Sequence, residues 1–274
     1  MSSKIQNAVI AITGAGSGIG RALAIQAGKE GARVALSDIK EADLQETKHL
    51  CEAAGATVLA TVLDVSKQDQ VTAWANEVHE HFGKVNVIIN NAGVALSASV
   101  EEMSNEDFEW LMGINFWGVI YGCQAFLPFI KQADWGHIVN VSSLFGLISI
   151  PNQSAYNSAK FAVRGFTESL RMELEIAGYP IGVSCVHPGG IKTNIANNGR
   201  YGKQVGKSFS AEKQKEFFNK SLARTSPESA ANDILNGIKN NRPRVLVGKD
   251  AKVLDALQRV LPARYQKLVM RVTQ

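Results

Sequence analysis

Two hydrophobic patterns alternate along the chain. Short runs of apolar residues, such as Ala8-Val9-Ile10-Ala11-Ile12, are typical of strands buried on both faces of a sheet. Between them lie longer segments in which apolar residues recur every three or four positions, as in amphipathic helices. The expected strands are 8–12, 33–37, 57–63, 85–89, 137–141, 181–186 and 245–247. The expected helices are one that ends near 30, then 40–54, 68–82, 105–131, one that ends near 177, and 227–240.

This alternation predicts an α/β fold with a parallel sheet, helices on both faces and right-handed crossovers. We expect a single doubly wound, Rossmann-like domain with a seven-stranded sheet over residues 1–249. Residues 250–274 are expected to form a C-terminal helical extension.

Two segments depart from the alternation. Residues 193–226 are polar and weakly periodic, which favours a flap over a site, and Phe209, Phe217 and Phe218 lie in it. The segment 250–274 carries apolar residues at helical spacing, interrupted by Pro262. Such an amphipathic tail could pack on the domain, on a partner subunit or over the substrate site. Binding to a membrane surface is the least favoured alternative.

Composition narrows the class of protein. The chain has 274 residues, 45% of them hydrophobic, and a formal net charge of +4. It shows no dense basic block interleaved with aromatic residues, so a nucleic-acid partner is not expected. The three cysteines have no metal-ligand spacing and are expected to be reduced. We find neither a signal-peptide pattern nor an apolar run of membrane-spanning length, so we expect a cytoplasmic protein.

A glycine turn follows the first strand, with the spacing T-G-x-x-x-G-x-G at Gly14, Gly18 and Gly20. Glycines at a strand-to-helix turn let backbone N–H groups approach a pyrophosphate, although a flexible turn would look the same. Asp38 ends the second strand, where a carboxylate can accept hydrogen bonds from the adenosine ribose and repel a 2′-phosphate. This favours NAD over NADP, although Lys40 lies close by. Alternatively, Asp38 is only an N-cap of the next helix.

Tyr156 and Lys160 lie four residues apart, on one face of an expected helix. A nearby ammonium favours the phenolate and lowers the pKa of a tyrosine, which would make Tyr156 a usable acid and base. The alternative is a half-buried tyrosine beside a solvated lysine on an ordinary amphipathic helix.

Taken in order, these motifs resemble those of the short-chain dehydrogenases/reductases, from Ala8 to about Gly248. The resemblance rests on Thr13-Gly14-x-x-x-Gly18-x-Gly20, Asp64-Val65, Asn90-Asn91-Ala92-Gly93, Asn115, Ser143, Tyr156-x-x-x-Lys160 and Pro188-Gly189. The family pattern favours Ser143 over its neighbour Ser142.

The resemblance implies four catalytic residues. Tyr156 is the general acid/base, and Lys160 lowers its pKa and holds the nicotinamide ribose. Ser143 binds the substrate oxygen, and Asn115 anchors a water in a proton relay.

The resemblance also implies a cofactor site. Asp64 and Val65 contact the adenine, and the stretch from Asn90 to Gly93 flanks the adenosine ribose. Ile191 and Thr193 contact the nicotinamide carboxamide. The complete expected cofactor set is Gly14, Ser17, Gly18, Ile19, Gly20, Asp38, Asp64, Val65, Asn91, Ala92, Gly93, Tyr156, Lys160, Pro188, Gly189, Ile191 and Thr193.

These residues lead to the hypothesis of an NAD-dependent alcohol dehydrogenase or carbonyl reductase acting on a secondary alcohol/ketone pair. A reductase of acyl-thioester β-keto groups or long-chain carbonyls is the alternative, and a non-catalytic dinucleotide sensor is a third. We expect a homodimer or homotetramer with a small-molecule substrate.

Overall fold

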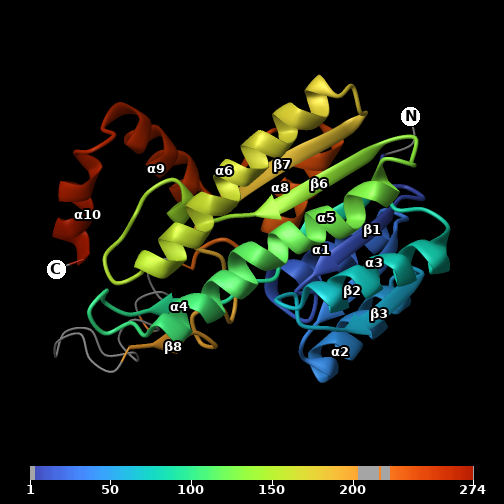
Figure 1. Ribbon diagram of the computed structural model, residues 1–274, viewed down its shortest axis with the longest axis horizontal. Coiled ribbons are helices and arrows are strands. Elements are labelled where there is room, and N and C mark those ends of the chain that lie inside the picture. The colour runs from blue at the N-terminus through green and yellow to red at the C-terminus, as the bar shows by residue number, and fades with distance from the viewer. Residues whose placement is uncertain (1–3, 203–215, 217–222, 274) are drawn as a thin grey trace.

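The structure is a computed structural model that describes residues 4–202, 216 and 223–273. Seven strands form one parallel sheet in the order β3-β2-β1-β4-β6-β7-β9 (Figure 1). Their bounds are β1 Val9–Thr13, β2 Arg33–Asp38, β3 Val58–Val62, β4 Val87–Asn90, β6 Gly136–Val141, β7 Ile181–Pro188 and β9 Arg244–Val247. The predicted doubly wound sheet is therefore confirmed. The chain changes direction across the sheet between β1 and β4, the position where α/β sheets bind ligands.

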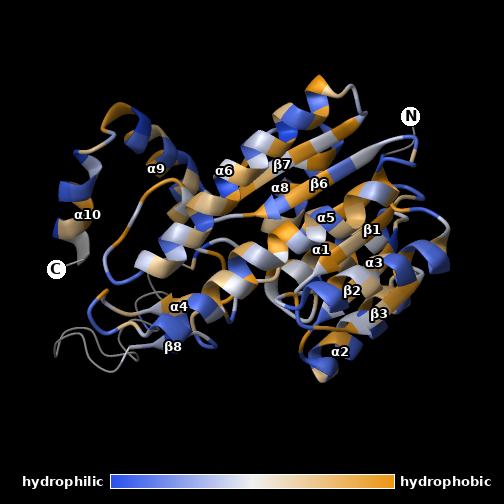
Figure 2. Cartoon of the chain, in the orientation of Figure 1, coloured by the Kyte–Doolittle hydropathy of each residue, from blue (hydrophilic) through white to orange (hydrophobic). Residues whose placement is uncertain are grey.

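Strand residues alternate between two hydrophobic clusters, one on each face of the sheet. Ile10 and Ile12 of β1 pack in one cluster with residues of α1 (Gly18–Lys29), α2 (Glu41–Ala53) and α8 (Pro227–Lys239). Val9 and Ala11 pack in the other with α3 (Gln68–Phe82) and α6 (Ser154–Ile176). Figure 2 shows hydrophobic residues along the strands, with hydrophilic ones among them in β6. Burial on both faces explains why they read as continuous apolar runs.

The helix predicted over 105–131 contains an irregular turn. It consists of α4 (Asn105–Met112), a π-helical turn (Gly113–Trp117) and α5 (Gly118–Ile130). By length and composition alone this stretch could cross a membrane, a test that the buried core helices of globular proteins also pass. Val119, Cys123 and Phe126 of α5 are nevertheless buried in the core on one face of the sheet. Such packing is typical of a core helix in a globular protein.

Two short strands were not predicted. β5 (Leu96–Ser97) follows β4, and β8 (Arg200–Tyr201) lies in the expected flap. They pair in parallel, Leu96 with Arg200 and Ser97 with Tyr201. The start of the flap is thus attached to the loop after β4. Phe209, Phe217 and Phe218 lie outside the described residues.

The expected tail forms α9 (Lys249–Val260) and α10 (Tyr265–Thr273), with Pro262 between them. Figure 1 shows both in red beside the loop that precedes α6. Tyr265 is buried against Leu144, Leu147 and Ile148 of that loop. Of the positions considered from the sequence, the tail therefore packs on the domain itself.

Candidate active site

The glycine turn after β1 is shaped by its neighbours. Gly14 and Gly18 have φ angles of +64° and +54°, which side chains disfavour. A Cβ on Gly20 would lie 2.1 Å from the carbonyl oxygen of Gly14. Asn91 supports the turn, since its Nδ2 donates to the carbonyl oxygens of Thr13 (2.9 Å) and Gly14 (3.2 Å). These positions therefore require glycine, as expected of a turn that a ligand approaches closely.

Asp38 is joined to this turn. Its Oδ2 accepts from the backbone N–H of Gly16 at 2.9 Å, and its Oδ1 accepts from Lys40 N–H at 3.0 Å. The N-cap of α2 is Lys40, so the alternative of Asp38 as that cap was wrong. The carboxylate instead lies beside the glycine turn at the end of β2.

The remaining residues near β1 to β3 have mixed surroundings. Ser17 is the exposed N-cap of α1, and Ile19 packs against the core. The Oδ1 of Asp64 accepts from the backbone N–H of Ser66 at 2.9 Å. Val65 is buried and packs where a Cβ on Gly118 would lie, 3.0 Å from its Cγ2. Asp64 thus orders the turn after β3, while Val65 packs against the long helix.

The stretch after β4 divides between core and site. Asn90 is buried, and its Nδ2 donates to Asn140 Oδ1 at 2.8 Å, so its side chain belongs to the core. Ala92 contacts the glycine turn, because its Cα would lie 2.8 Å from a Cβ on Gly14. A Cβ on Gly93 would lie 3.2 Å from Asn115 Oδ1 and 3.5 Å from Lys160 Nζ. Gly93 therefore borders the expected catalytic residues.

Asn115 lies in the π-helical turn and is fully buried. Its Oδ1 accepts from Val94 N–H at 2.8 Å, and its Nδ2 donates to the Val94 carbonyl oxygen at 2.9 Å. A π-helical turn inside an α-helix is frequent at functional sites. Here it holds the side chain that fixes the loop after Gly93.

Ser143, Tyr156 and Lys160 come together at the end of β6. Lys160 is buried, with Nζ donating to the Val141 carbonyl oxygen at 3.0 Å and lying 5.6 Å from the centroid of the Tyr156 ring. The Oγ of Ser143 accepts from the Phe145 N–H at 3.1 Å and lies close enough to Tyr156 to lower the pKa of the phenol. The rival Ser142 faces differently, because its Oγ donates to the Lys160 carbonyl oxygen at 2.8 Å.

Burial dominates the ionisation of this pair. It raises the pKa of Tyr156 to about 12, against a smaller lowering by the hydrogen bond with Ser143. It also lowers the pKa of Lys160 to about 8. The resemblance implies that Lys160 lowers the pKa of Tyr156, and in this structure the net direction is the opposite. Desolvation of the phenolate is the larger effect on Tyr156, and desolvation also disfavours the charged form of Lys160.

The segment after β7 reaches back to the glycine turn. Gly189 follows Pro188 and donates its N–H to the Val247 carbonyl oxygen at 3.0 Å. Ile191 is buried in the core, whereas Thr193 lies against the turn, with Cγ2 3.0 Å from where a Cβ on Gly18 would lie.

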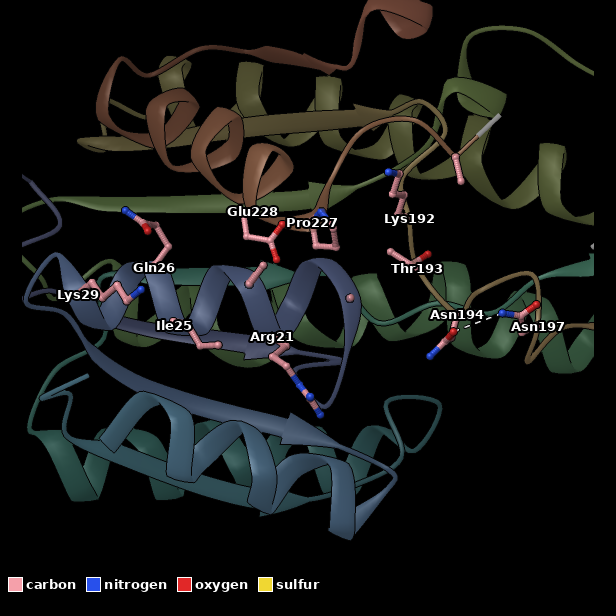
Figure 3. Close-up of a pocket in the computed structure, with 13 residues that line it drawn as sticks. Arg21, Ile25, Gln26, Lys29, Lys192, Thr193, Asn194, Asn197, Pro227 and Glu228 are labelled. Carbon is pink, nitrogen blue, oxygen red and sulfur yellow. Dashed lines mark hydrogen bonds between the residues drawn. The ribbon is translucent and has the colours of Figure 1, made fainter. Parts of the chain in front are cut away.

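A cavity of about 500 Å³ opens between α1, the segment 192–197 and the start of α8 (Figure 3). Gly18 and Thr193 line it, together with Arg21, Lys192 and Glu228. It therefore adjoins the expected pyrophosphate side of the site.

One residue beside the site was missed from the sequence. His187, directly before Pro188, is fully buried, and its Nδ1 donates to the Ser143 carbonyl oxygen at 2.9 Å. Burial lowers its pKa to about 4. A histidine inside the apolar strand Ile181–Pro188 was the available signal, because a polar residue buried there requires a partner.

The residues present fit a dinucleotide. The glycine turn leaves room only for backbone, Asp38 stands beside it, and Lys160 lies within reach of Gly93. The described residues thus offer a glycine turn for phosphates, a carboxylate for a ribose and a buried lysine, all beyond the carboxyl ends of the strands.

Comparison with known proteins agrees with this geometry. Residues 8–204 match the family model of the short chain dehydrogenases. The chain is 48% identical over 267 residues to SadH, a proposed oxidoreductase of Mycobacterium tuberculosis, covering 97% of this chain and 95% of SadH.

Solved structures agree as well. A short chain dehydrogenase/reductase from Burkholderia phymatum in complex with NAD matches with a TM-score of 0.88 and 33% identity, over 96% of both chains. Levodione reductase matches with a TM-score of 0.79 and 29% identity, over 90% of this chain and 98% of that one. The chain therefore belongs to the short-chain dehydrogenase family and is an oxidoreductase with a nicotinamide dinucleotide cofactor.

Proposed function

We propose that the protein is an NAD-dependent alcohol dehydrogenase or carbonyl reductase that interconverts a secondary alcohol and a ketone. The observation that carries the proposal is the grouping of Ser143, Tyr156 and Lys160 at the end of β6, with Lys160 Nζ 5.6 Å from the centroid of the tyrosine ring. A hydroxyl pair of this kind binds one oxygen atom and exchanges one proton with it.

Each catalytic residue then has a role. NAD, when bound, supplies the acceptor or donor of hydride. The Tyr156 hydroxyl gives a proton to the substrate oxygen in reduction and takes it in oxidation. Ser143 donates a hydrogen bond to that oxygen as charge develops there. The Lys160 ammonium stabilises the phenolate against the cost of burial, and it holds the nicotinamide ribose.

Asn115 has a supporting role in this proposal. Its side chain holds both backbone groups of Val94, which places Gly93 beside Lys160 Nζ. An ordered loop at this point keeps a path for a water between Asn115 and Lys160, as the relay requires.

Asp38 supports NAD rather than NADP. Its carboxylate is held by two backbone N–H groups beside the glycine turn, so it can accept from ribose hydroxyls with its remaining lone pairs. A 2′-phosphate in the same place would meet a fixed negative charge.

A reductase of acyl-thioester β-keto groups or of long-chain carbonyls is the second candidate. It is favoured by the apolar cluster in which Tyr265 of the tail packs against Leu147 and Ile148 of the loop after Ser143. A non-catalytic sensor is less well supported, because Asn115, Ser143, Tyr156 and Lys160 are all present. The name of levodione reductase, one of the similar structures, denotes action on a dione, which is closer to the first candidate.

The deciding experiment is a substrate panel followed by NADH absorbance. Cyclic and linear ketones are compared with β-ketoacyl thioesters of matched chain length, with NADPH as the second cofactor. We expect turnover of free ketones to exceed that of the thioesters. Faster turnover of thioesters would select the second candidate, and absence of turnover with the whole panel would favour the sensor.

We further propose that the protein forms a homodimer or homotetramer through the long helix and α6. Trp117 and Phe161 on these helices are 48% and 38% exposed. Large aromatic side chains at this exposure are common where a second copy packs. Light scattering at several concentrations would give the number of subunits, and a monomer at all of them would contradict the proposal.

A further inference from the structure

The carboxylate of Asp250, in the first turn of α9, is enclosed by the backbone of three glycines. Its Oδ2 accepts from the Gly190 N–H at 2.7 Å. A Cβ on Gly189 would lie 2.2 Å from both carboxylate oxygens. A Cβ on Gly248, where φ is +92°, would lie 2.5 Å from Oδ1. The glycines at these positions therefore leave room for one particular side chain from the tail.

The segment held by Asp250 is also fixed from its other side. The Gly190 carbonyl oxygen accepts from the N–H groups of Arg224 and Thr225, both at 3.1 Å. The N–H of Lys192 donates to the Thr225 carbonyl oxygen at 2.9 Å. The backbone from 189 to 192 is thus held between the segment before α8 and the first turn of α9. Asp250 supplies the side-chain contact on the α9 side.

The tail is well anchored for such a role. Asp255, one turn further along α9, pairs with Arg244 of β9 at 3.3 Å and with Arg259 at 2.9 Å. The Oη of Tyr265 accepts from Ser149 N–H at 3.0 Å. Asp250 is therefore presented from a tail that is fixed at two other points, one on α9 and one on α10.

We propose that Asp250 is a positioning residue for the nicotinamide end of the cofactor site. By holding Gly190, it sets the path of the backbone to Ile191 and Thr193, the residues assigned to the nicotinamide carboxamide. This inference rests on the proposed function, and on the contacts with the nicotinamide carboxamide that the family resemblance implies for Ile191 and Thr193. The adenosine and pyrophosphate end, built by the glycine turn and Asp38, does not depend on it.

The test compares two probes by isothermal titration calorimetry on the full-length protein. NADH carries the nicotinamide, whereas ADP-ribose has the adenosine, the pyrophosphate and the second ribose but lacks the nicotinamide ring. For Asp250→Ala, we expect the Kd for NADH to rise about tenfold, the usual effect of losing a hydrogen bond to a charged group. The Kd for ADP-ribose should stay within about twofold of wild type.

Two further variants sharpen the test. Asp250→Asn keeps an acceptor of the same shape without its charge, so NADH binding should weaken by about threefold, and this variant decides the matter if Asp250→Ala does not fold. Asp255→Ala loosens the same helix without contacting Gly190, and it should leave the ratio of the two Kd values at its wild-type value.

Three results would overturn the proposal. The first is unchanged NADH binding in the Asp250 variants, and the second is an equal loss for both probes, which would make Asp250 a general structural residue. The third is the same selective loss in Asp255→Ala. If wild-type protein bound neither probe, the cofactor assignment would fail together with this inference, whereas a failed ketone panel with intact NADH binding would leave the inference standing.

Discussion

The imidazole of His187 and the backbone carbonyl oxygen of Ser143 are joined by a hydrogen bond of 2.9 Å across neighbouring strands β7 and β6. A carbonyl oxygen only accepts, so Nδ1 carries the proton of the neutral ring. The bond ties Ser143, just beyond β6 and beside Tyr156, to His187, the residue before Pro188. The bond therefore links the catalytic segment that contains Ser143 to the cofactor-binding segment that begins at Pro188.

Burial of His187 predicts sensitivity to acid, because it lowers the pKa of the imidazole more than the bond to Ser143 raises it. The pKa of His187 is lowered from 6.5 to about 4, so the unfolded chain binds its proton first as pH falls. Stability is fully present above pH 6.5 and is lost as pH falls from 6.5 towards 4, by on the order of 3 kcal/mol. The free energy of unfolding, measured with urea between pH 7 and 4, should depend less steeply on pH for His187→Asn than for wild type. Parallel slopes would contradict the prediction.

Removal of the Tyr156 hydroxyl should abolish proton transfer while leaving the cofactor site in place. For Tyr156→Phe we expect kcat to fall by about 10²- to 10⁴-fold, the usual contribution of a general acid/base. The Kd for NADH should change little. Tyr179→Phe, at a surface ring covered by Lys131, is the matched control and should keep wild-type turnover. Near-normal kcat in Tyr156→Phe would refute the assignment.

Lys160 should give stability an unusual dependence on alkaline pH. Its pKa is lowered from 10.5 to about 8 by burial, so between these values the unfolded chain binds more protons than the folded one. Wild type should therefore gain stability relative to Lys160→Met as pH rises from 8 to 10.5. Only the difference between the two proteins is informative, because buried cysteines titrate in the same range. If the difference in the free energy of unfolding did not change with pH, the pKa of Lys160 would not be lowered in the folded protein.

Asp38 should control the choice between NAD and NADP. In Asp38→Asn the amide removes the negative charge but keeps an acceptor for the Gly16 N–H. We expect the preference for NADH over NADPH, measured as a ratio of Kd values, to fall by about tenfold or more. Asp43→Asn removes a charge close to the same turn and should leave the ratio unchanged. Tighter binding of NADPH by wild type would reject the role of Asp38 outright.

Gly20 and Gly165 offer a matched pair of glycine-to-alanine changes. A methyl group on Gly20 would overlap the Gly14 carbonyl oxygen, so Gly20→Ala should destabilise the fold by at least about 2 kcal/mol. At Gly165, on α6, a Cβ meets nothing within 4 Å among the described residues, and alanine should stabilise the helix by up to about 1 kcal/mol. Thermal unfolding would show shifts of opposite sign, and equal shifts would contradict the steric argument.

The strands and the glycine turn could be predicted because each depends on local pattern. Ile10 and Ile12 face one layer of helices while Val9 and Ala11 face the other, so burial leaves a continuous apolar run in the sequence. The same holds for Tyr156 and Lys160, whose helical spacing brings them to one face. These features follow from periods of two and 3.6 residues.

Other features depend on contacts between distant residues and left no local pattern. The adjacent asparagines Asn90 and Asn91 look equivalent in sequence, yet one pairs with Asn140 in the core and the other supports the glycine turn. The partner of Gly190 lies 60 residues away in the tail. The strand pair β5–β8 forms between segments about a hundred residues apart, where neither alone has the length of an ordinary strand.

The wide turn at Gly113–Trp117 makes the long helix sensitive to the number of its residues. A π-helical turn takes in an extra residue, and each residue of an α-helix corresponds to about 100° of rotation. Deleting a single residue between Met112 and Gly118 would let the helix close into regular α turns, with α4 and α5 each keeping the face that they bury. Asn115 would then leave Val94 while the core contacts of α5 remained. Deletion of one residue in this turn would therefore leave a protein that folds but has lost the geometry of its site.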